Sequence, residues 1–282
     1  MTGSREQLEN EGYTVIRGLA DSGAIDRVLD TYRSDIVPST DYFYRQSGDA
    51  WLPNVLTEAG FVRDSFLDVH DMKRHEAFAA AVRGVLCAPR TMRAIDEATG
   101  RAPHALVQSM LFDLNAATRA HRDDYYLDST SPPGELVAAW VALEDIHESA
   151  GRFFVIPGSQ RDKLVLSDRQ LADNETFLRW VEETYGGSPR TAPALAKGDV
   201  LLWSSRTIHG SFETRDPRRS RKSLTAHYLP MASPFGNIRG PHAVQPVFRS
   251  DEGVFYRATN NARSRWHGAA SRAAGWLKRR LR

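Results

Sequence analysis

Short hydrophobic runs separated by turn-forming residues dominate the chain beyond its first hundred residues. The runs cover residues 104–114, 136–146, 152–156, 200–203 and 218–230. The segments between them include proline- and glycine-containing turns such as 131–134 and 148–151, and this pattern predicts β-strands. Because most of these strands follow one another without an intervening helix, the pattern favours an antiparallel sandwich or jelly roll over a doubly wound α/β sheet.

The first hundred residues show mainly helical periodicity. After a short predicted strand at 12–19, Asp21 begins a helix whose hydrophobic positions recur at helical spacing to about Ser34. A second helical stretch runs from about 71 to 99, with a break near Pro89. Together with the later strands, these helices predict a mainly β fold with flanking helices, an α+β arrangement.

Two further segments interrupt these patterns. Residues 38–62 have no clear period but are rich in aromatic side chains, and residues 167–185 form a helical insert among the strands. An irregular segment of the first kind usually covers a binding site. Its aromatic residues are equally consistent with a loop pinned to the core. Both interpretations remain open from the sequence.

Length and composition indicate one domain and a tail. The chain has 282 residues, 41% of them hydrophobic, which suffices for a sizeable core. We expect a domain at residues 1–258 followed by a basic amphipathic helix at 259–282. No hydrophobic run approaches the roughly 20 residues of a membrane-spanning helix. The polar amino terminus and the single cysteine, Cys87, predict a location in a reducing cytoplasm. The oligomeric state is not predicted.

The positive charge of the chain is concentrated at its carboxy terminus. The formal net charge is +2, but residues 263–282 contain seven basic and no acidic residues, so removing them leaves −5 for the rest. A mildly acidic body argues against a nucleic-acid-binding protein. The tail either lies peripherally on an anionic membrane, at its inner face, with Trp266 and Trp276 at headgroup depth, or docks on the acidic body.

Candidate metal ligands occur around His121. Asp123 follows it by two residues in a segment expected to be extended, so both side chains should project to the same face. An imidazole and a carboxylate need one more ligand to hold a redox-active divalent metal with open positions, and His209 is the best candidate. A His-x-Asp triplet alone is weak evidence, because it arises often by chance.

Polar residues also share the faces of otherwise hydrophobic strands. By alternation, Ser211 faces the same side as His209. On the strand at 218–230, Arg221 and His227 share one face. An inward arginine fits the wall of an anion site, where it presents a fork of donors to a carboxylate. His227 is expected to be a buried histidine whose hydrogen bonds are satisfied.

Gln108 is the one polar residue on its strand face. We expect it to share that face with Leu106, Met110, Phe112 and Leu114. A core-facing amide needs hydrogen-bond partners. These are either backbone groups or a bound cosubstrate, and the sequence leaves both open.

In combination these features resemble the phytanoyl-CoA hydroxylase (phytanoyl-CoA dioxygenase) family of Fe(II)- and 2-oxoglutarate-dependent dioxygenases. The resemblance covers roughly residues 10–232, and its specificity lies in the order of several short motifs. These motifs are His121-x-Asp123, the segments 140–145 and 151–160, His209-Gly210-Ser211, Arg221 twelve residues after His209, and Gln108.

The resemblance implies a double-stranded β-helix of the cupin-like kind and an enzyme that uses O₂. The residues it implies are His121, Asp123 and His209 as Fe(II) ligands, and Arg221, Ser211 and Gln108 as 2-oxoglutarate contacts. The implied reaction hydroxylates an unactivated C–H bond and releases succinate and CO₂. In related halogenases a small residue replaces the carboxylate ligand, so Asp123 favours hydroxylation over halogenation.

Candidate substrate contacts follow the metal ligands along the chain. By strand alternation Tyr125 should face the cavity, and Asp124 or Tyr126 should line its rim. A purely structural role for the two tyrosines is equally consistent with the sequence. Trp140, on the central strand, is a further candidate. Arg122 alternates to the opposite face and is expected at the exterior.

Three functions are compatible with these residues. The first is hydroxylation of a small molecule such as a biosynthetic or natural-product intermediate. The second is the same chemistry on a lipid-linked or cell-envelope glycolipid substrate, with the tail at the membrane. The third is a jelly-roll binding module without catalysis, against which the complete set of implied ligands argues.

Overall fold

The computed structural model describes residues 2–46, 50–167, 173–237, 240–241 and 247–258. The tail helix predicted at 259–282 lies outside the described residues. So does part of the insert predicted at 167–185. In the described part of the chain, none of the helices combines the length and hydrophobicity needed to cross a bilayer.

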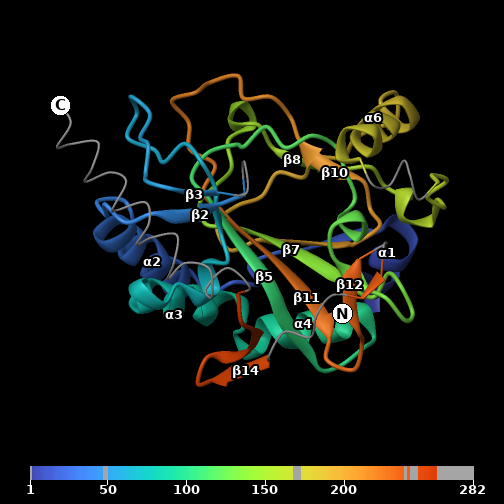
Figure 1. The fold of residues 1–282 in the computed structure, drawn as a ribbon, viewed down its shortest axis with the longest axis horizontal. Coiled ribbons are helices and arrows are strands. Elements are labelled where there is room, and N and C mark those ends of the chain that lie inside the picture. Colours follow the sequence, from blue (N-terminus) through green and yellow to red (C-terminus); the bar gives the residue numbers. More distant parts are fainter. Residues whose placement is uncertain (1, 47–49, 168–172, 238–239, 242–246, 259–282) are drawn as a thin grey trace.

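A large β-sheet forms the centre of the molecule (Figure 1). Its strands run in the order β1-β9-β7-β11-β5-β4-β2-β3, with antiparallel neighbours, and β15 and β14 extend it beside β5. The bounds are β1 Tyr13–Ile16, β2 Phe43–Arg45, β3 Ala50–Leu52, β4 Phe66–Leu67, β5 His104–Phe112, β7 Val137–Ala142, β9 Val200–Ser204, β11 Ser223–Pro230, β14 Val247–Ser250 and β15 Gly253–Tyr256.

A small sheet lies across from the large one. It consists of β8 (Phe153–Val155) and β10 (His209–Ser211), and Figure 1 shows both strands apart from the main sheet. A third sheet joins β6 (Asp128–Ser129), β12 (Phe235–Asn237) and β13 (Gly240–Pro241). Facing, mostly antiparallel sheets with flanking helices confirm the predicted jelly-roll architecture.

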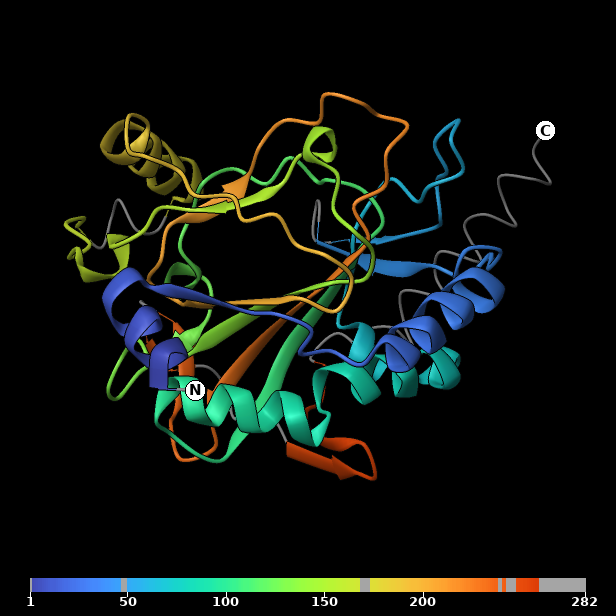
Figure 2. The same cartoon turned by 180° about the vertical axis from the view of Figure 1, so that it is seen from behind.

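Helices pack on the outer face of the large sheet and beside the small sheet (Figure 2). Their bounds are α1 Thr2–Glu11, α2 Ser22–Thr31, α3 Glu76–Leu86, α4 Pro89–Thr99 and α6 Asn174–Tyr185. Buried residues of α2, α3 and α4, such as Ile25, Phe78 and Ile95, pack with Leu111 and Leu224 of the large sheet. Phe177 and Val181 of α6 pack on the small sheet instead. A cavity lies between the inner faces of the two sheets.

The predicted helix boundaries follow from local chemistry. Asp21 caps α2 by accepting a hydrogen bond from the backbone N–H of Ala24 at 2.8 Å. Pro89 starts α4, and Gly100 ends it in the left-handed conformation with φ 67°. A π-helical turn at Tyr32–Ile36 continues α2. Helix α1 was not predicted, because its residues carry little hydrophobic periodicity.

A register shift changes the face of one residue on β5. Leu106 was expected beside Gln108, but the pairing with β11 shifts between His227 and Tyr228, so that Val107 has no partner. Leu106 consequently packs in the helix-covered core, and Gln108 lines the cavity. The prediction of one continuous face was wrong here, because a bulge of one residue reverses the alternation.

The aromatic segment at 38–62 is pinned to the core and also contributes to the cavity, so both interpretations of it apply. Its strands β2 and β3 join the edge of the large sheet. Phe43 is buried and packs edge-on against Phe66 at 5.1 Å between ring centroids. Gln46, next to β2, lines the cavity. The segment is thus pinned by aromatic residues and also forms part of the cavity wall.

Candidate functional site

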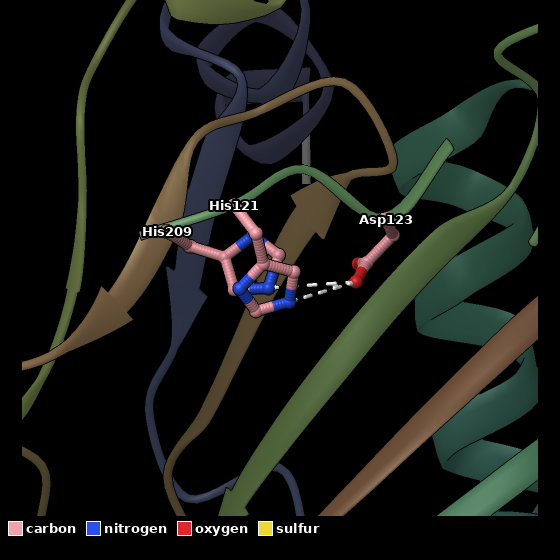
Figure 3. Close-up of side chains that lie close together, drawn as sticks. All are labelled: His121, Asp123 and His209. Carbon is pink, nitrogen blue, oxygen red and sulfur yellow. Dashed lines mark ion pairs between the residues drawn. The ribbon is translucent and has the colours of Figure 1, made fainter. Parts of the chain in front are cut away.

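Three predicted ligand residues meet beside the small sheet (Figure 3). His121 and His209 lie on paired extended segments and exchange two backbone hydrogen bonds, both 2.9 Å. Their Nε2 atoms lie 3.6 and 3.5 Å from Oδ1 of Asp123. Since neighbouring ligands of a first-row metal at about 2.1 Å lie about 3 Å apart, the three residues can hold one ion.

The backbone around Asp123 is only partly extended. Arg122 has extended angles (φ −127°, ψ 143°), which brings Asp123 to the same side as His121 as predicted. A 3-10 helix then begins and spans Asp123–Tyr125. Strand alternation therefore holds for His121 and Asp123 but ends directly after them.

Backbone carbonyls orient both histidines. Nδ1 of His121 lies 2.8 Å from the carbonyl oxygen of Arg119, and Nδ1 of His209 lies 2.9 Å from that of Thr207. A carbonyl only accepts hydrogen bonds, so each Nδ1 carries the proton. The unprotonated Nε2 of each ring therefore faces Asp123, as a metal ligand requires.

Burial and proximity set the charge states of this group. Burial lowers the pKa of His209 to about 4, against the opposing effect of Asp123. Burial by itself would raise the pKa of Asp123, but His209 and His227 beside it hold that pKa well below its usual range. A neutral imidazole and an ionised carboxylate are the forms that bind metal ions at neutral pH.

A cavity of about 920 Å³ opens beside the three residues, between the two sheets. Most of its wall is hydrophobic or aromatic. The residues of this kind include Leu67, Met110, Phe112, Tyr126, Leu127, Trp140, Phe153, Leu178 and Trp203. Such a mainly apolar enclosure with a few converging polar groups is typical of a small-molecule site.

Arg221 and Ser211 place free polar atoms in this cavity. Arg221 is 2% exposed and donates from Nη1 to the carbonyl oxygen of Gly151 at 3.0 Å, but its Nε has no partner among the described residues. Oγ of Ser211 is also buried without a partner there. Burial lowers the pKa of Arg221 to about 10, so the group stays charged at neutral pH. A buried cation with a free donor is suited to bind a carboxylate.

Gln108 and His227 are cross-strand neighbours that both line the cavity. The amide of Gln108 makes no hydrogen bond to other described residues, which favours its interpretation as a ligand contact. His227 is 2% exposed, and neither ring nitrogen has a hydrogen-bond partner in the described structure. The prediction of a satisfied buried histidine was wrong, because this strand face borders a cavity rather than packed core.

The 3-10 turn directs Tyr125 and Asp124 away from the cavity. Tyr125 is 1% exposed and stacks on Phe177 at 3.9 Å between ring centroids. Asp124 accepts two hydrogen bonds of 2.7 Å from Arg122. Arg122 itself is 2% exposed. The prediction that Tyr125 faces the cavity and that Arg122 is exterior was wrong, because the chain does not alternate after Asp123.

Tyr126 and Trp140, by contrast, do line the cavity. The ring of Tyr126 meets that of His121 edge-on at 5.7 Å, and its hydroxyl donates to Oδ1 of Asn174 at 2.8 Å. Both residues therefore stay candidates for substrate contact.

Trp203 belongs to this site but was not singled out from the sequence. Its Nε1–H donates to Oδ2 of Asp123 at 2.8 Å. A buried indole N–H requires an acceptor, which is a usable signal. The sequence does not indicate which acceptor it is, because Asp123 is distant along the chain.

Comparison with known families identifies the protein class. The model of the phytanoyl-CoA dioxygenase (PhyH) family matches residues 8–222. The chain belongs to this family. Peroxisomal phytanoyl-CoA dioxygenase of Rattus norvegicus is 24% identical over 259 residues, covering 84% of this chain and 70% of the rat protein. Phytanoyl-CoA dioxygenase 1 of Oryza sativa subsp. japonica is 29% identical over 130 residues, 44% of each chain.

Several solved structures share this fold at low sequence identity. The epimerase SnoN, in complex with Fe³⁺, alpha ketoglutarate and a nogalamycin ligand, has a TM-score of 0.60 at 17% identity over 90% of this chain and 97% of its own. EctD from S. alaskensis, with 2-oxoglutarate and 5-hydroxyectoine, has a TM-score of 0.58 at 17% identity over 86% and 82%.

Membership of the PhyH family defines the enzyme class. The protein is a non-haem iron- and 2-oxoglutarate-dependent dioxygenase, with Fe(II), 2-oxoglutarate and O₂ as cofactor and cosubstrates. The family, the enzyme class and the cofactors predicted from the sequence are thereby confirmed.

Proposed function

We propose that this PhyH-family enzyme hydroxylates a C–H bond of a bulky small molecule, with His121, Asp123 and His209 as the ligands of Fe(II). The observation that carries the proposal is the convergence of their ligand atoms beside a cavity that also contains a buried arginine, Arg221, whose Nε has no partner among the described residues. Bound Fe(II) supplies the coupling of substrate oxidation to the conversion of 2-oxoglutarate and O₂ into succinate and CO₂.

Arg221 binds the distal carboxylate of 2-oxoglutarate in this proposal. Its guanidinium lies 5.8 Å from the ring centroids of both Phe112 and Trp140. These rings exclude water from the cation and limit its movement, which strengthens a charge-assisted hydrogen bond. Ser211 and Gln108, on the facing walls, supply further hydrogen bonds to the cosubstrate.

The substrate occupies the part of the cavity toward Tyr126 and Leu178, because Trp140 lies beside Arg221 at the cosubstrate end. A cavity of about 920 Å³ is near the upper end of the range for small-molecule sites, so it has room for a substrate beside the cosubstrate. Two structural neighbours, SnoN and SnoK, are described as enzymes of nogalamycin biosynthesis. Cavity size and this similarity support a natural-product or other biosynthetic intermediate as substrate.

The proposed outcome is hydroxylation, because Asp123 provides the carboxylate that a halogenase lacks. SnoN and SnoK are described as an epimerase and a carbocyclase, so the outcome needs a direct measurement. Product mass spectrometry decides it. Hydroxylation adds one oxygen atom, whereas epimerisation leaves the mass unchanged and ring closure removes two hydrogen atoms.

The test of the metal assignment is iron content together with succinate release. We expect near-stoichiometric Fe(II) in the anaerobically loaded wild type, and succinate release that accelerates with the correct member of a panel of bulky apolar compounds. Asp123→Ala should lose most of the iron and the activity. The control is Asp251→Ala, which removes an exposed carboxylate in the turn between β14 and β15. Unchanged iron in Asp123→Ala would show that other residues bind the metal.

The alternative of a lipid-linked substrate rests on the sequence of residues 259–282 alone. We retain it as a second proposal for the location of the enzyme, in which the basic tail contacts an anionic membrane.

A further inference from the structure

Each of the three proposed metal ligands is oriented by a hydrogen bond to another residue. For His121 and His209 this partner is the backbone carbonyl of Arg119 or Thr207, which any residue at those two positions would provide. For Asp123 the partner is a side chain, the indole of Trp203. A substitution of Trp203 therefore removes the group that orients Asp123. A substitution of Arg119 or Thr207 keeps the backbone carbonyl that orients His121 or His209.

The two carboxylate oxygens of Asp123 have separate roles. Oδ1 faces the histidines, at 3.5 and 3.6 Å from their Nε2 atoms. Oδ2 accepts the hydrogen bond from Nε1 of Trp203 at 2.8 Å. Nε2 of His227 lies 3.5 Å from the same Oδ2 but lacks hydrogen-bond geometry. The indole thus engages the oxygen that points away from the histidines.

Trp203 is itself held rigidly. It is 1% exposed and lies on β9, which pairs with β1 on one side and β7 on the other. Its ring contacts Phe153 and His209, both at 4.9 Å between centroids. One immobile side chain therefore touches two of the three proposed ligands.

The backbone attaches Asp123 to the same strand. The N–H of Asp124 donates to the carbonyl oxygen of Ser205, just beyond β9, at 3.1 Å. The N–H of Tyr126 closes the 3-10 turn onto the carbonyl of Asp123 at 2.7 Å. Both the main chain and the side chain of Asp123 are therefore positioned from the end of β9.

We infer that Trp203 is a positioning residue for the metal site, whose indole N–H holds Oδ2 of Asp123 so that Oδ1 alone reaches the ion. The inference rests on the proposed role of Asp123 as a ligand. A carboxylate free to rotate must give up that freedom when it binds the ion, so loss of the indole N–H weakens metal binding. Removing the hydrogen-bond partner of a metal ligand commonly lowers the metal affinity about 10- to 100-fold.

The test compares Mn(II) affinity, which reports on the site without turnover. Isothermal titration of the full-length proteins with Mn(II) should give a dissociation constant about 10- to 100-fold weaker for Trp203→Phe than for the wild type. Trp180→Phe, which removes an indole from α6, should bind Mn(II) like the wild type. Co(II) absorption spectra should differ between Trp203→Phe and the wild type, because the ligand field at the ion changes.

The hydrogen bond can also be removed without changing shape. Replacing the tryptophans with benzothienylalanine substitutes sulfur for the N–H in an otherwise similar ring. We expect the same loss of Mn(II) affinity in the protein that contains benzothienylalanine. Its measurement replaces that of Trp203→Phe if the phenylalanine variant does not fold. Wild-type Mn(II) affinity in a folded variant without the N–H would overturn the inference. If Asp123→Ala also retained Mn(II), the ligand assignment itself would be at fault.

Discussion

The buried polar residues of the cavity destabilise the folded protein unless a ligand forms hydrogen bonds with them. Arg221, Ser211 and His227 all carry buried side-chain atoms without hydrogen-bond partners in the described structure. Each such atom destabilises the folded protein by about 1–3 kcal/mol relative to a satisfied one. Their gathering around one cavity is best explained by a polar ligand that satisfies several of them at once.

Arg221→Ala tests the strongest of these groups. A charge-assisted hydrogen bond contributes about 1.5–3 kcal/mol, so the variant should bind 2-oxoglutarate about 10- to 100-fold more weakly, with unchanged Mn(II) content. Calorimetric titration of Mn(II)-loaded protein with 2-oxoglutarate measures this. Arg218→Ala removes an arginine that is 85% exposed and serves as control. Equal affinity of the wild type and Arg221→Ala would assign the carboxylate to another residue.

Asp128 predicts a pH dependence of stability. Burial raises the pKa of this carboxyl from 3.8 to about 6, although it accepts hydrogen bonds from the backbone N–H groups of Ser129 and Leu136. The folded state thus binds the proton more tightly than the unfolded state. The resulting stabilisation is complete below about pH 4 and is lost as pH rises through about 6, by about 3 kcal/mol in total.

Asp128→Asn should remove this contribution to the pH dependence, because the amide keeps an acceptor oxygen but does not ionise. Urea unfolding of both proteins from pH 4 to 7 gives the comparison. We expect the free energy of unfolding of the wild type to fall relative to that of Asp128→Asn over this interval. A constant difference between the two would mean that Asp128 ionises at its ordinary pKa.

At the scale of elements, single irregular turns decide which side chains reach the cavity. The bulge in β5 turns Leu106 into the core, and the 3-10 turn after Arg122 turns Tyr125 onto α6. The first adds one residue to the two-residue period of a strand, and the second replaces the strand by a 3-10 helix of three residues. Sequence alternation therefore predicted Gln108, Met110 and Phe112 correctly but not their neighbours beyond the irregularity.

The wall formed by β2 and the loop before β4 depends on Arg45. This arginine is 0% exposed, donates to Oδ1 of Asn54 at 2.6 Å and to the carbonyl of Asp64 at 3.0 Å, and lies 4.1 Å from the ring centroid of Phe66. Arg45→Met should lower the free energy of unfolding by about 2–4 kcal/mol, because two partly buried acceptors lose their donor and a fully buried side chain is replaced.

Denaturant titration provides the measurement for this variant. Arg33→Met, at a guanidinium that is 64% exposed, should change the stability by less than about 0.5 kcal/mol. If Arg45→Met proved as stable as Arg33→Met, the buried arginine would not be what holds this wall.

At the scale of the whole molecule, the division between an acidic body and a basic tail yields a prediction about location. Full-length protein should sediment with anionic vesicles at low salt and dissociate as the Debye length contracts from about 10 Å at 0.1 M to about 3 Å at 1 M. Protein lacking residues 259–282 and vesicles of neutral lipid serve as controls. Absence of vesicle binding, together with a lower melting temperature on truncation, would favour a tail docked on the body.

The sequence by itself determined the enzyme class, the helix boundaries at Asp21, Pro89 and Gly100, and the set of polar residues from which the site is built. These features are local: a cap, a turn or a two-residue spacing acts through neighbouring atoms, and the family motifs are read from their order along the chain. His121 and Asp123 were identifiable for this reason.

Only the tertiary structure decided which of these side chains meet. The hydrogen bond from Trp203 to Asp123, the lack of a hydrogen-bond partner for His227 among the described residues and the buried ion pair of Arg122 with Asp124 all depend on how distant segments pack. Such contacts follow from sheet register and from one-residue irregularities in it. No local pattern encodes them, because a shift of one residue reverses a strand face while leaving the composition of the strand unchanged.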